Sequence, residues 1–167
     1  MKVNWPERLW VNSPLRYLIQ QRETQFLKRL RGLKPGTRCL EIGCGHGAGA
    51  RIILRTFQPE RLDGLDVDPA MIRLAIKRQP HWTVDRLLFF VGDAQQLPYA
   101  DGSMDAVFNF GIIHHLENWE QGISEICRVL KKGGGFYFEE IYPPLYANVI
   151  TRRLLDHPTE NRFHGPE

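Results

Sequence analysis

The chain has 167 residues, of which 43% are hydrophobic and 25% charged, a composition typical of one globular domain with a single core. No stretch approaches the roughly 18 apolar residues of a membrane span, and the N-terminus lacks the apolar segment of a signal peptide, so we expect a cytoplasmic protein. The three cysteines form no Cys-x-x-Cys pair, so neither a disulfide framework nor a metal site is expected. Basic residues are scattered around a net charge of +3, so no nucleic-acid partner is expected.

The predicted elements alternate between helices and strands. Ser13-Pro14 is a cap followed by proline at the first helical position, and apolar residues at helical spacing predict an amphipathic helix up to about Gly32. Further helices are expected from about Gly47, from Asp68-Pro69, and from Trp119 to Leu130, where glycines 133–135 end the last one. The predicted strands are Arg38–Ile42, Arg61–Asp66, Leu87–Val91, Met104–Phe110 and Gly134–Ile141. This alternation implies a doubly wound, mostly parallel α/β sheet with helices on both faces.

The segment from Arg38 to Ala50 is the most informative part of the chain. An apolar strand contains the acid Glu41 and is followed by glycines at positions 43, 45, 47 and 49. Such glycines permit positive φ and remove the Cβ atoms that would hold a ligand away from the main chain. The helix that follows would offer free N–H groups to a carboxylate or phosphate. An ordinary glycine-rich turn is the alternative.

Polar residues also follow the other predicted strands. Asp66 follows the second strand, Asp93 the third, and the segment from Asn109 to His115 the fourth. Ligands of doubly wound sheets bind beyond the carboxyl ends of the strands, where the strand order reverses. These four strand ends therefore define a candidate site.

With these residues in place, the chain resembles the class I S-adenosylmethionine-dependent methyltransferases over about residues 36–142. It is most similar to the small-molecule branch that includes ubiquinone and menaquinone biosynthesis enzymes. The resemblance implies a Rossmann-like sheet of order 3-2-1-4-5. The motifs that carry it are Leu40-Glu-Ile-Gly-Cys-Gly-His-Gly47, Leu65-Asp-Val-Asp-Pro69, Gly92-Asp-Ala-Gln-Gln-Leu-Pro98, Met104-Asp-Ala-Val-Phe108, His114-His-Leu116 and Arg128-Val-Leu-Lys-Lys-Gly-Gly134.

The resemblance implies S-adenosylmethionine as cofactor. Its methionine part would lie against the loop Gly43–Gly47, which includes Cys44 and Gly45, with Glu41 near its amino group. Asp66, followed by Val67 in the same motif, would accept hydrogen bonds from the ribose hydroxyls. Asp68 is interpreted as the cap of the next helix rather than as a ligand contact. Cys44 is interpreted as a small loop residue, because no base stands beside it in the sequence.

The adenine and methionine ends would be contacted by further residues. Asp93 would meet the exocyclic amine of adenine, and the backbone N–H of Ala94 a ring nitrogen; a plain turn is the alternative for Asp93. Met71 or Ile72 would cover one face of adenine, although either could equally belong to the core. Asn109 would approach the methionine end. Tyr17 would either close over the cofactor or pack on its helix.

His114 and His115 are the candidate catalytic residues. Methyl transfer from a sulfonium is a direct displacement that mainly requires alignment, but an acceptor that must lose a proton needs a base. One of the two histidines could face the small-molecule acceptor as that base, and a structural hydrogen-bond role is the alternative. The sequence does not name the acceptor.

The C-terminal part departs from the family pattern. After Pro143-Pro144, a helix over 145–155 and a polar tail over 156–167 are predicted, and the last two strands of the family are not found. We therefore expect one truncated domain over 1–167, with an N-terminal helical segment at 1–35, a cofactor-binding core at 36–142 and a C-terminal segment at 143–167. An exposed fifth strand would allow a homodimer to form through the sheet edge.

Two other functions are compatible with the motifs. The chain could be a non-catalytic or fragmentary module that holds the cofactor without transferring methyl groups. It could also be an NAD(P)-binding oxidoreductase domain, since Gly43-x-Gly45-x-x-Ala48 satisfies the looser dinucleotide fingerprint with Asp66 in the ribose position. Glu41, Gly47 and the missing second mononucleotide half argue against the oxidoreductase.

Overall fold

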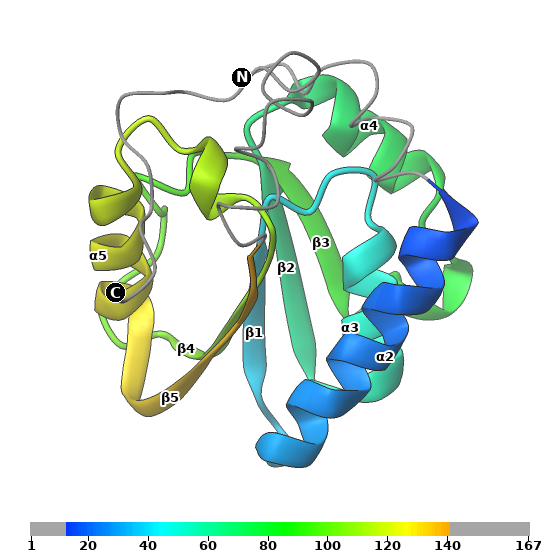
Figure 1. The fold of residues 1–167 in the computed structure, drawn as a ribbon, viewed down its shortest axis with the longest axis horizontal. Helices are drawn as coiled ribbons and strands as arrows, with labels where there is room; N and C mark the ends of the chain where they lie inside the picture. Colours follow the sequence, from blue (N-terminus) through cyan, green and yellow to red (C-terminus); the bar gives the residue numbers. More distant parts are fainter. Residues whose placement is uncertain (1–12, 141–167) are drawn as a thin grey trace, which may run out of the picture.

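The computed structural model of the chain describes residues 13–140. The predicted C-terminal helix over 145–155 and the polar tail lie outside the described residues. No helix in the described part is both long and apolar enough to cross a bilayer. Figure 1 shows α2 (Pro14–Leu30), β1 (Arg38–Ile42), α3 (Ala48–Thr56), β2 (Arg61–Asp66), α4 (Pro69–Lys77), η1 (His81–Thr83), β3 (Leu87–Val91), β4 (Met104–Phe110), η2 (Ile113–His115), α5 (Trp119–Val129) and β5 (Leu130–Glu139).

All strand pairs of the sheet are parallel, and the strand order is β3-β2-β1-β4-β5, which confirms the predicted topology. The order reverses between β1 and β4, so the loops that follow these two strands lie at the switch point. Within the described residues, β3 and β5 are the two edge strands. Pairing of two copies through β5 stays a prediction.

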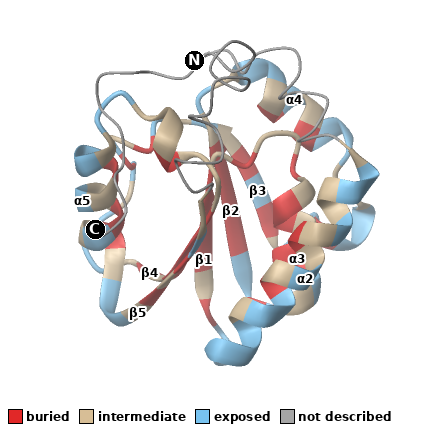
Figure 2. Cartoon of the chain, in the orientation of Figure 1, coloured by how far each residue is buried: buried red, intermediate tan, exposed pale blue. Residues whose placement is uncertain are grey.

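Helices cover both faces of the sheet (Figure 1). One core cluster joins the sheet to α3, α4 and Leu27 of α2, and the other joins it to α5 and the segment 94–99. Neighbouring side chains of β4 enter opposite clusters, because successive residues of a strand point to opposite faces: Ala106 and Phe108 belong to the first cluster and Val107 to the second. Figure 2 shows the central strands buried along most of their length.

The predicted bounds of β1 to β4 are confirmed, but the bounds of β5 were wrong. β5 begins at Leu130, directly after α5, so the glycines 133–135 lie inside the strand and do not end the helix. Pairing with β4 shifts register between Met104 and Ala106, whose partners are Leu130 and Gly135. Gly133 has a φ of +78°, which lets the backbone loop out at this irregularity.

Helix α2 begins as predicted but buries a different face from the one its apolar pattern indicates. The Ser13 hydroxyl oxygen accepts a hydrogen bond from the Arg16 N–H, and Pro14 occupies the first turn. The buried residues of the helix are Gln20 and Thr24, whose hydroxyl donates to the Gln20 carbonyl. The helix packs mainly on α3, and Leu27 reaches the core cluster of the sheet. Four large apolar side chains consequently stay exposed: Leu15, Leu18, Phe26 and Leu30.

Three aromatic rings pack together in the core against β4 and β5. The fully buried Phe108 ring stacks on Tyr137 with ring centroids 4.8 Å apart, and Phe57 of the α3 C-terminus meets both rings edge-on at 5.0 Å. The Tyr137 hydroxyl donates to the Arg31 carbonyl and so ties the end of α2 to β5.

We expect Phe108→Ala to lower the free energy of unfolding by about 3–5 kcal/mol, because the truncation leaves a cavity among rings that are already close-packed. Phe138→Ala is the matched control, since Phe138 is 50% exposed and should cost less than about 1 kcal/mol. Urea denaturation of both variants measures the difference. Equal losses would contradict the assignment of Phe108 to the core.

Candidate functional site

The glycine-rich loop is held by the end of the neighbouring strand β2. The Cys44 N–H donates to the Leu65 carbonyl at 2.9 Å, and the Gly45 N–H donates to Asp66 Oδ2 at 2.8 Å. The other carboxylate oxygen of Asp66 accepts the Asp68 N–H at 2.9 Å. Burial raises the pKa of Asp66, and the backbone N–H groups of Asp68 and Gly45 oppose this shift. Asp66 therefore fixes the loop, and each of its oxygens still has a lone pair for a further donor.

The loop glycines meet different surroundings. Gly43, Gly45 and Gly47 all have positive φ. A Cβ atom at Gly43 would lie 2.2 Å from Ile112 Cγ2, and one at Gly47 would lie 2.7 Å from Phe89 Cζ, whereas a Cβ atom at Gly45 would have no atom within 4 Å. Packing thus explains two of the glycines. Gly45 is the one that faces open space, as a ligand-contacting glycine must.

Glu41 is a buried acid beside this loop. Its side chain lies under the N-terminus of α3, where a Cβ atom at Gly49 would come within 1.9 Å of Oε1. Burial and the nearby Asp66 raise the pKa of Glu41 well above its ordinary value, while Arg51 and the Ala50 N–H oppose the shift. Within residues 13–140, Oε2 of Glu41 has no hydrogen-bond partner. A buried carboxylate oxygen without a donor fits an ammonium group on a ligand.

The residues that follow β2 divide between structural and exposed positions. Asp68 caps α4, since its Oδ1 accepts the Ala70 N–H at 2.7 Å, which confirms its interpretation as a cap. Val67 is exposed. Ile72 belongs to the core, while Met71 is only half-buried. Of the two predicted to cover adenine, Met71 is therefore the one available to a ligand.

The segment after β3 forms a turn that α5 holds in place. Asp93 is exposed, and its Oδ1 accepts the Gln95 N–H at 2.8 Å, as in the turn considered as its alternative role; Ala94 is buried. The guanidinium of Arg128 donates to the carbonyls of Leu97 and Tyr99 at 3.0 and 2.7 Å. The arginine of the 128–134 motif thus anchors the loop expected to contact adenine, a long-range role that the sequence does not reveal.

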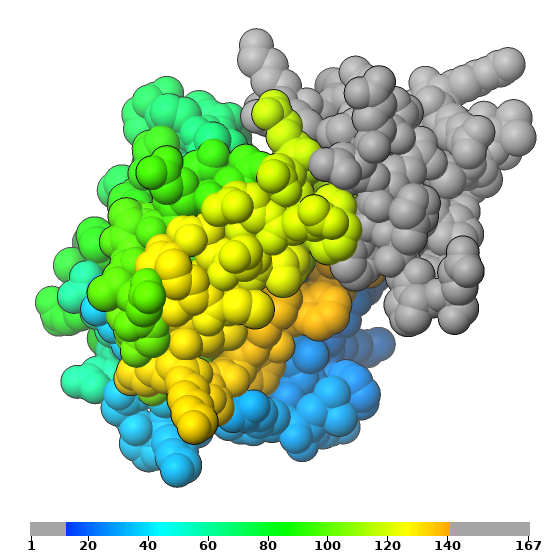
Figure 3. Space-filling model, turned by 90° about the vertical axis from the view of Figure 1, so that its left-hand side faces the viewer, coloured from blue at the N-terminus to red at the C-terminus, as the bar shows by residue number. Residues whose placement is uncertain are grey.

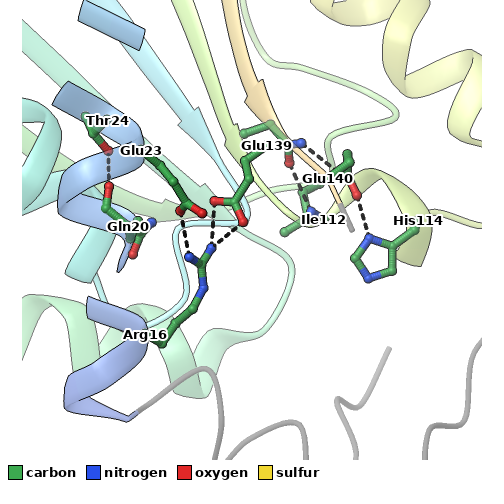
Figure 4. A network of polar contacts seen from close by, with 9 residues as sticks. Arg16, Gln20, Glu23, Thr24, Ile112, His114, Glu139 and Glu140 are labelled. Carbon is green, nitrogen blue, oxygen red and sulfur yellow. Dashed lines mark hydrogen bonds and ion pairs between the residues drawn. The ribbon is translucent and has the colours of Figure 1, made fainter. Parts of the chain in front are cut away.

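A glutamate that the sequence analysis missed organises the other side of the site. Glu140 follows β5, and its Oε1 accepts the Asn109 side-chain N–H at 2.7 Å and the Ile113 N–H at 2.8 Å. Its Oε2 lies 2.6 Å from His114 Nδ1, and both side chains are at most 8% exposed (Figure 4). Asn109 also accepts the Ile112 N–H through Oδ1, so both the nitrogen and the oxygen of its side-chain amide help to hold η2.

This network reaches the glycine loop through Ile112, whose side chain occupies the space that a Cβ atom at Gly43 would need. The His115 ring lies against the His114 ring, with centroids 4.0 Å apart and the planes tilted by 40°. His114 is paired with the carboxylate of Glu140. A glutamate directly after the end of a strand carries no local signal for such a role, which explains why the sequence did not predict it.

Helix α2 is attached to the same end of the sheet. Arg16 donates to both carboxylate oxygens of Glu139, at 2.9 and 2.7 Å, and to Glu23 at 2.8 Å (Figure 4). Burial and the neighbouring Glu23 raise the pKa of Glu139 to about 7, and Arg16 opposes the shift. Figure 3 shows α2 in blue beside β5 in yellow and orange. Tyr17, one residue after Arg16, is half-buried.

The residues of this site also bear on two other chemistries, a cysteine nucleophile and a metal centre. Cys44 is buried, and burial together with the neighbouring acids Glu41 and Asp66 raises the pKa of its thiol, so the nucleophilic thiolate is disfavoured. Among residues 13–140, no three His, Cys, Asp or Glu side chains gather in a way that could hold a metal ion.

A family model described as a methyltransferase domain matches residues 40–138, more than half of the chain. The chain therefore belongs to this family, the class I S-adenosylmethionine-dependent methyltransferases whose motifs its sequence carries. A solved relative is phosphoethanolamine N-methyltransferase 2 of Haemonchus contortus, in complex with S-adenosyl-L-methionine. It is 32% identical with a TM-score of 0.63, and the match covers 70% of this chain and 27% of that one.

Two curated relatives are similar in sequence. The fatty-acid O-methyltransferase of Mycolicibacterium smegmatis is 37% identical over 125 residues, which cover 75% of this chain and 44% of the relative. The phthiotriol/phenolphthiotriol dimycocerosates methyltransferase of Mycobacterium tuberculosis is 38% identical over 108 residues, which cover 65% of this chain and 39% of the relative. The matched regions thus span less than half the length of either relative.

We expect Gly43→Ala to destabilise the protein much more than Gly45→Ala. Both substitutions place alanine at positive φ, which costs roughly 1–2 kcal/mol, but only the first also drives a Cβ atom into Ile112. Thermal unfolding of the two variants isolates the collision, because the backbone strain is common to both. Equal shifts in Tm would contradict the packing of η2 against the loop.

Proposed function

We propose that this chain transfers the methyl group of S-adenosylmethionine to an oxygen atom of a lipid-type acceptor. The observation that carries the proposal is the 37% sequence identity to the fatty-acid O-methyltransferase. The second relative, named for phthiotriol and phenolphthiotriol dimycocerosates, favours the same acceptor class. Neither name favours the narrower resemblance to quinone-biosynthesis enzymes.

The cofactor would be held by acids that the sheet brings together. Glu41 would pair with the amino group of the methionine part, and Asp66 would accept the ribose hydroxyls with the lone pairs left by Gly45 and Asp68. The open space at Gly45 would admit the ligand close to the main chain. We assign the adenine end to Met71 and to the turn at 93–94. When bound, the cofactor supplies an electrophilic methyl group on a sulfonium.

His114 would act as the base for a hydroxyl acceptor. When Nδ1–H donates to Glu140, the neutral imidazole carries its lone pair on Nε2, where it can accept a proton. A hydroxyl must lose its proton as the new C–O bond forms, whereas a carboxylate is already ionised near neutral pH. The need for His114 should therefore depend on the acceptor. Glu140 is a positioning residue in this scheme, because it acts through His114.

The test is methyl transfer to two acceptors of similar length, palmitate and a long-chain alcohol, with the methylated product measured by mass spectrometry. We expect palmitate methyl ester to form. We expect His114→Ala to reduce transfer to the alcohol by about 10²- to 10⁴-fold, the usual contribution of a general base, and to change transfer to palmitate far less.

Glu140→Gln is the companion variant, because its amide can donate to Nδ1 and move the imidazole proton to Nε2. Nitrogen-15 NMR of the His114 ring would report that tautomer change independently of activity. Binding of S-adenosylmethionine without transfer to either acceptor would contradict the proposal and favour the non-catalytic cofactor-binding module.

Cofactor binding should release a proton from Glu41. The raised pKa of Glu41 means that the free protein keeps this carboxyl protonated above its usual range, and a bound ammonium would favour the ionised form. Affinity should therefore rise with pH until Glu41 is ionised in the free protein. Calorimetry in buffers of different ionisation enthalpy measures the released proton. Glu41→Gln should abolish the release; a release unchanged in that variant would contradict the role of Glu41.

A further inference from the structure

Positive charge is concentrated in the segment that carries α2. Residues 13–34 contain six basic residues and a single acid, Glu23, for a net charge of +5, so that the rest of the chain carries −2. Two of the basic residues, Arg22 and Arg29, are exposed and take part in no ion pair within residues 13–140. The net charge of +3 therefore combines a strongly positive segment around α2 with a slightly negative remainder of the chain.

The outer face of α2 also carries an apolar stripe. At 100° per residue, the four apolar side chains that form it (Leu15, Leu18, Phe26 and Leu30) fall in a sector of about 120° on the helix, opposite the buried Thr24. Much of this helix is pale blue in Figure 2, the colour of exposed positions. Arg22 and Arg29 lie within the same sector. The stripe consists of Leu15, Leu18, Phe26 and Leu30, which are 57%, 57%, 58% and 67% exposed.

A basic groove runs along one side of the stripe, between α2 and α3. It has a volume of about 570 Å³, and its lining contains three cations and no carboxylate. One of the cations, Arg55, lies with its guanidinium 5.5 Å from the ring centre of Trp82, which is 50% exposed. The residues that line the basic groove are Gln21, Gln25, Lys28, Arg29, Ile52, Arg55 and Thr56.

We infer that α2 docks on the surface of an anionic lipid bilayer, with the apolar stripe in the headgroup–acyl boundary and lipid phosphates at the basic groove. Helices that lie in a membrane interface combine an apolar face with Lys and Arg, and α2 carries Arg22 and Arg29 within the sector of the stripe and Lys28 in the groove beside it. Anionic lipids attract such basic residues by about 1 kcal/mol each. A nucleic acid would complement the cations but leave the apolar stripe in water.

The docking surface and the candidate site share one helix. The inner side of α2 is tied to the site end of β5 through Arg16 and Glu139, while its outer side carries the apolar stripe. A docked α2 would bring lipid acceptors beside the site. The inference does not depend on the proposed methyl transfer, because binding to a membrane needs neither cofactor nor acceptor.

Co-sedimentation with large unilamellar vesicles tests the inference. We expect the chain to bind vesicles of equal parts phosphatidylglycerol and phosphatidylcholine, to bind pure phosphatidylcholine much more weakly, and to dissociate as salt is raised. Arg22→Gln with Arg29→Gln should weaken binding by about 30-fold, from two basic residues at about 1 kcal/mol each. Leu18→Ser with Phe26→Ser should weaken it by at least 10-fold.

The controls are equivalent changes at exposed positions of α4: Arg73→Gln with Lys77→Gln for charge, and Ile76→Ser, whose side chain is 53% exposed, for the apolar contact. Circular dichroism establishes that each variant is folded. Neither control should change binding, and millimolar inorganic phosphate should not compete. Failure to bind anionic vesicles, equal weakening by the α4 controls, or displacement by phosphate would each overturn the inference.

Discussion

The hydrogen bond from the Gly45 N–H to Asp66 is the constraint on which the site depends. It joins the loop after β1 to the end of β2, and the neighbouring bond from Cys44 to Leu65 holds the same loop to the same strand. Because the strands are parallel, the carboxyl ends of β1 and β2 lie at the same end of the sheet. A single carboxylate can therefore shape the loop and still accept hydroxyl groups from a ligand.

Other acids at the same end of the sheet also hold neighbouring segments or remain available to a ligand. Glu41 is buried in β1, and Glu139 and Glu140 stand at the end of β5. Glu139 holds α2 through Arg16, and Glu140 holds η2 through two N–H groups and His114. Burying carboxylates is costly unless donors surround them. Glu41 is the one with an oxygen that lacks a donor in the described part of the chain, which is why it is the acid best suited to a cationic ligand group.

The sequence predicted most of the fold because its signals are local. Strand-like runs marked β1 to β4, and Ser13-Pro14 and Asp68-Pro69 marked the starts of two helices, all as observed. The start of β5 was missed because glycines usually end helices, whereas here they accommodate an irregular strand. The buried face of α2 could not be predicted, since packing on α3 and not apolar periodicity determines it.

The candidate site was predictable only where a motif carries the information. Asp66 and the glycine loop lie together as expected, although packing against Ile112 and Phe89 explains two of the glycines better than ligand contact does. The roles of Glu140 and Arg128 arise from contacts with residues 26 to 31 positions away along the chain. No periodicity or spacing in the sequence records such contacts.

Titration with S-adenosylmethionine by calorimetry tests the central claim most directly, comparing the unchanged chain with Asp66→Ala and Asp68→Ala. The two variants each remove one carboxylate from the same turn, but only Asp66 holds the glycine loop, while Asp68 caps α4. We predict binding by the unchanged chain, a loss of at least tenfold in affinity for Asp66→Ala, and near-normal affinity for Asp68→Ala. Absence of binding by the unchanged chain, or equal affinities for all three proteins, would contradict the account.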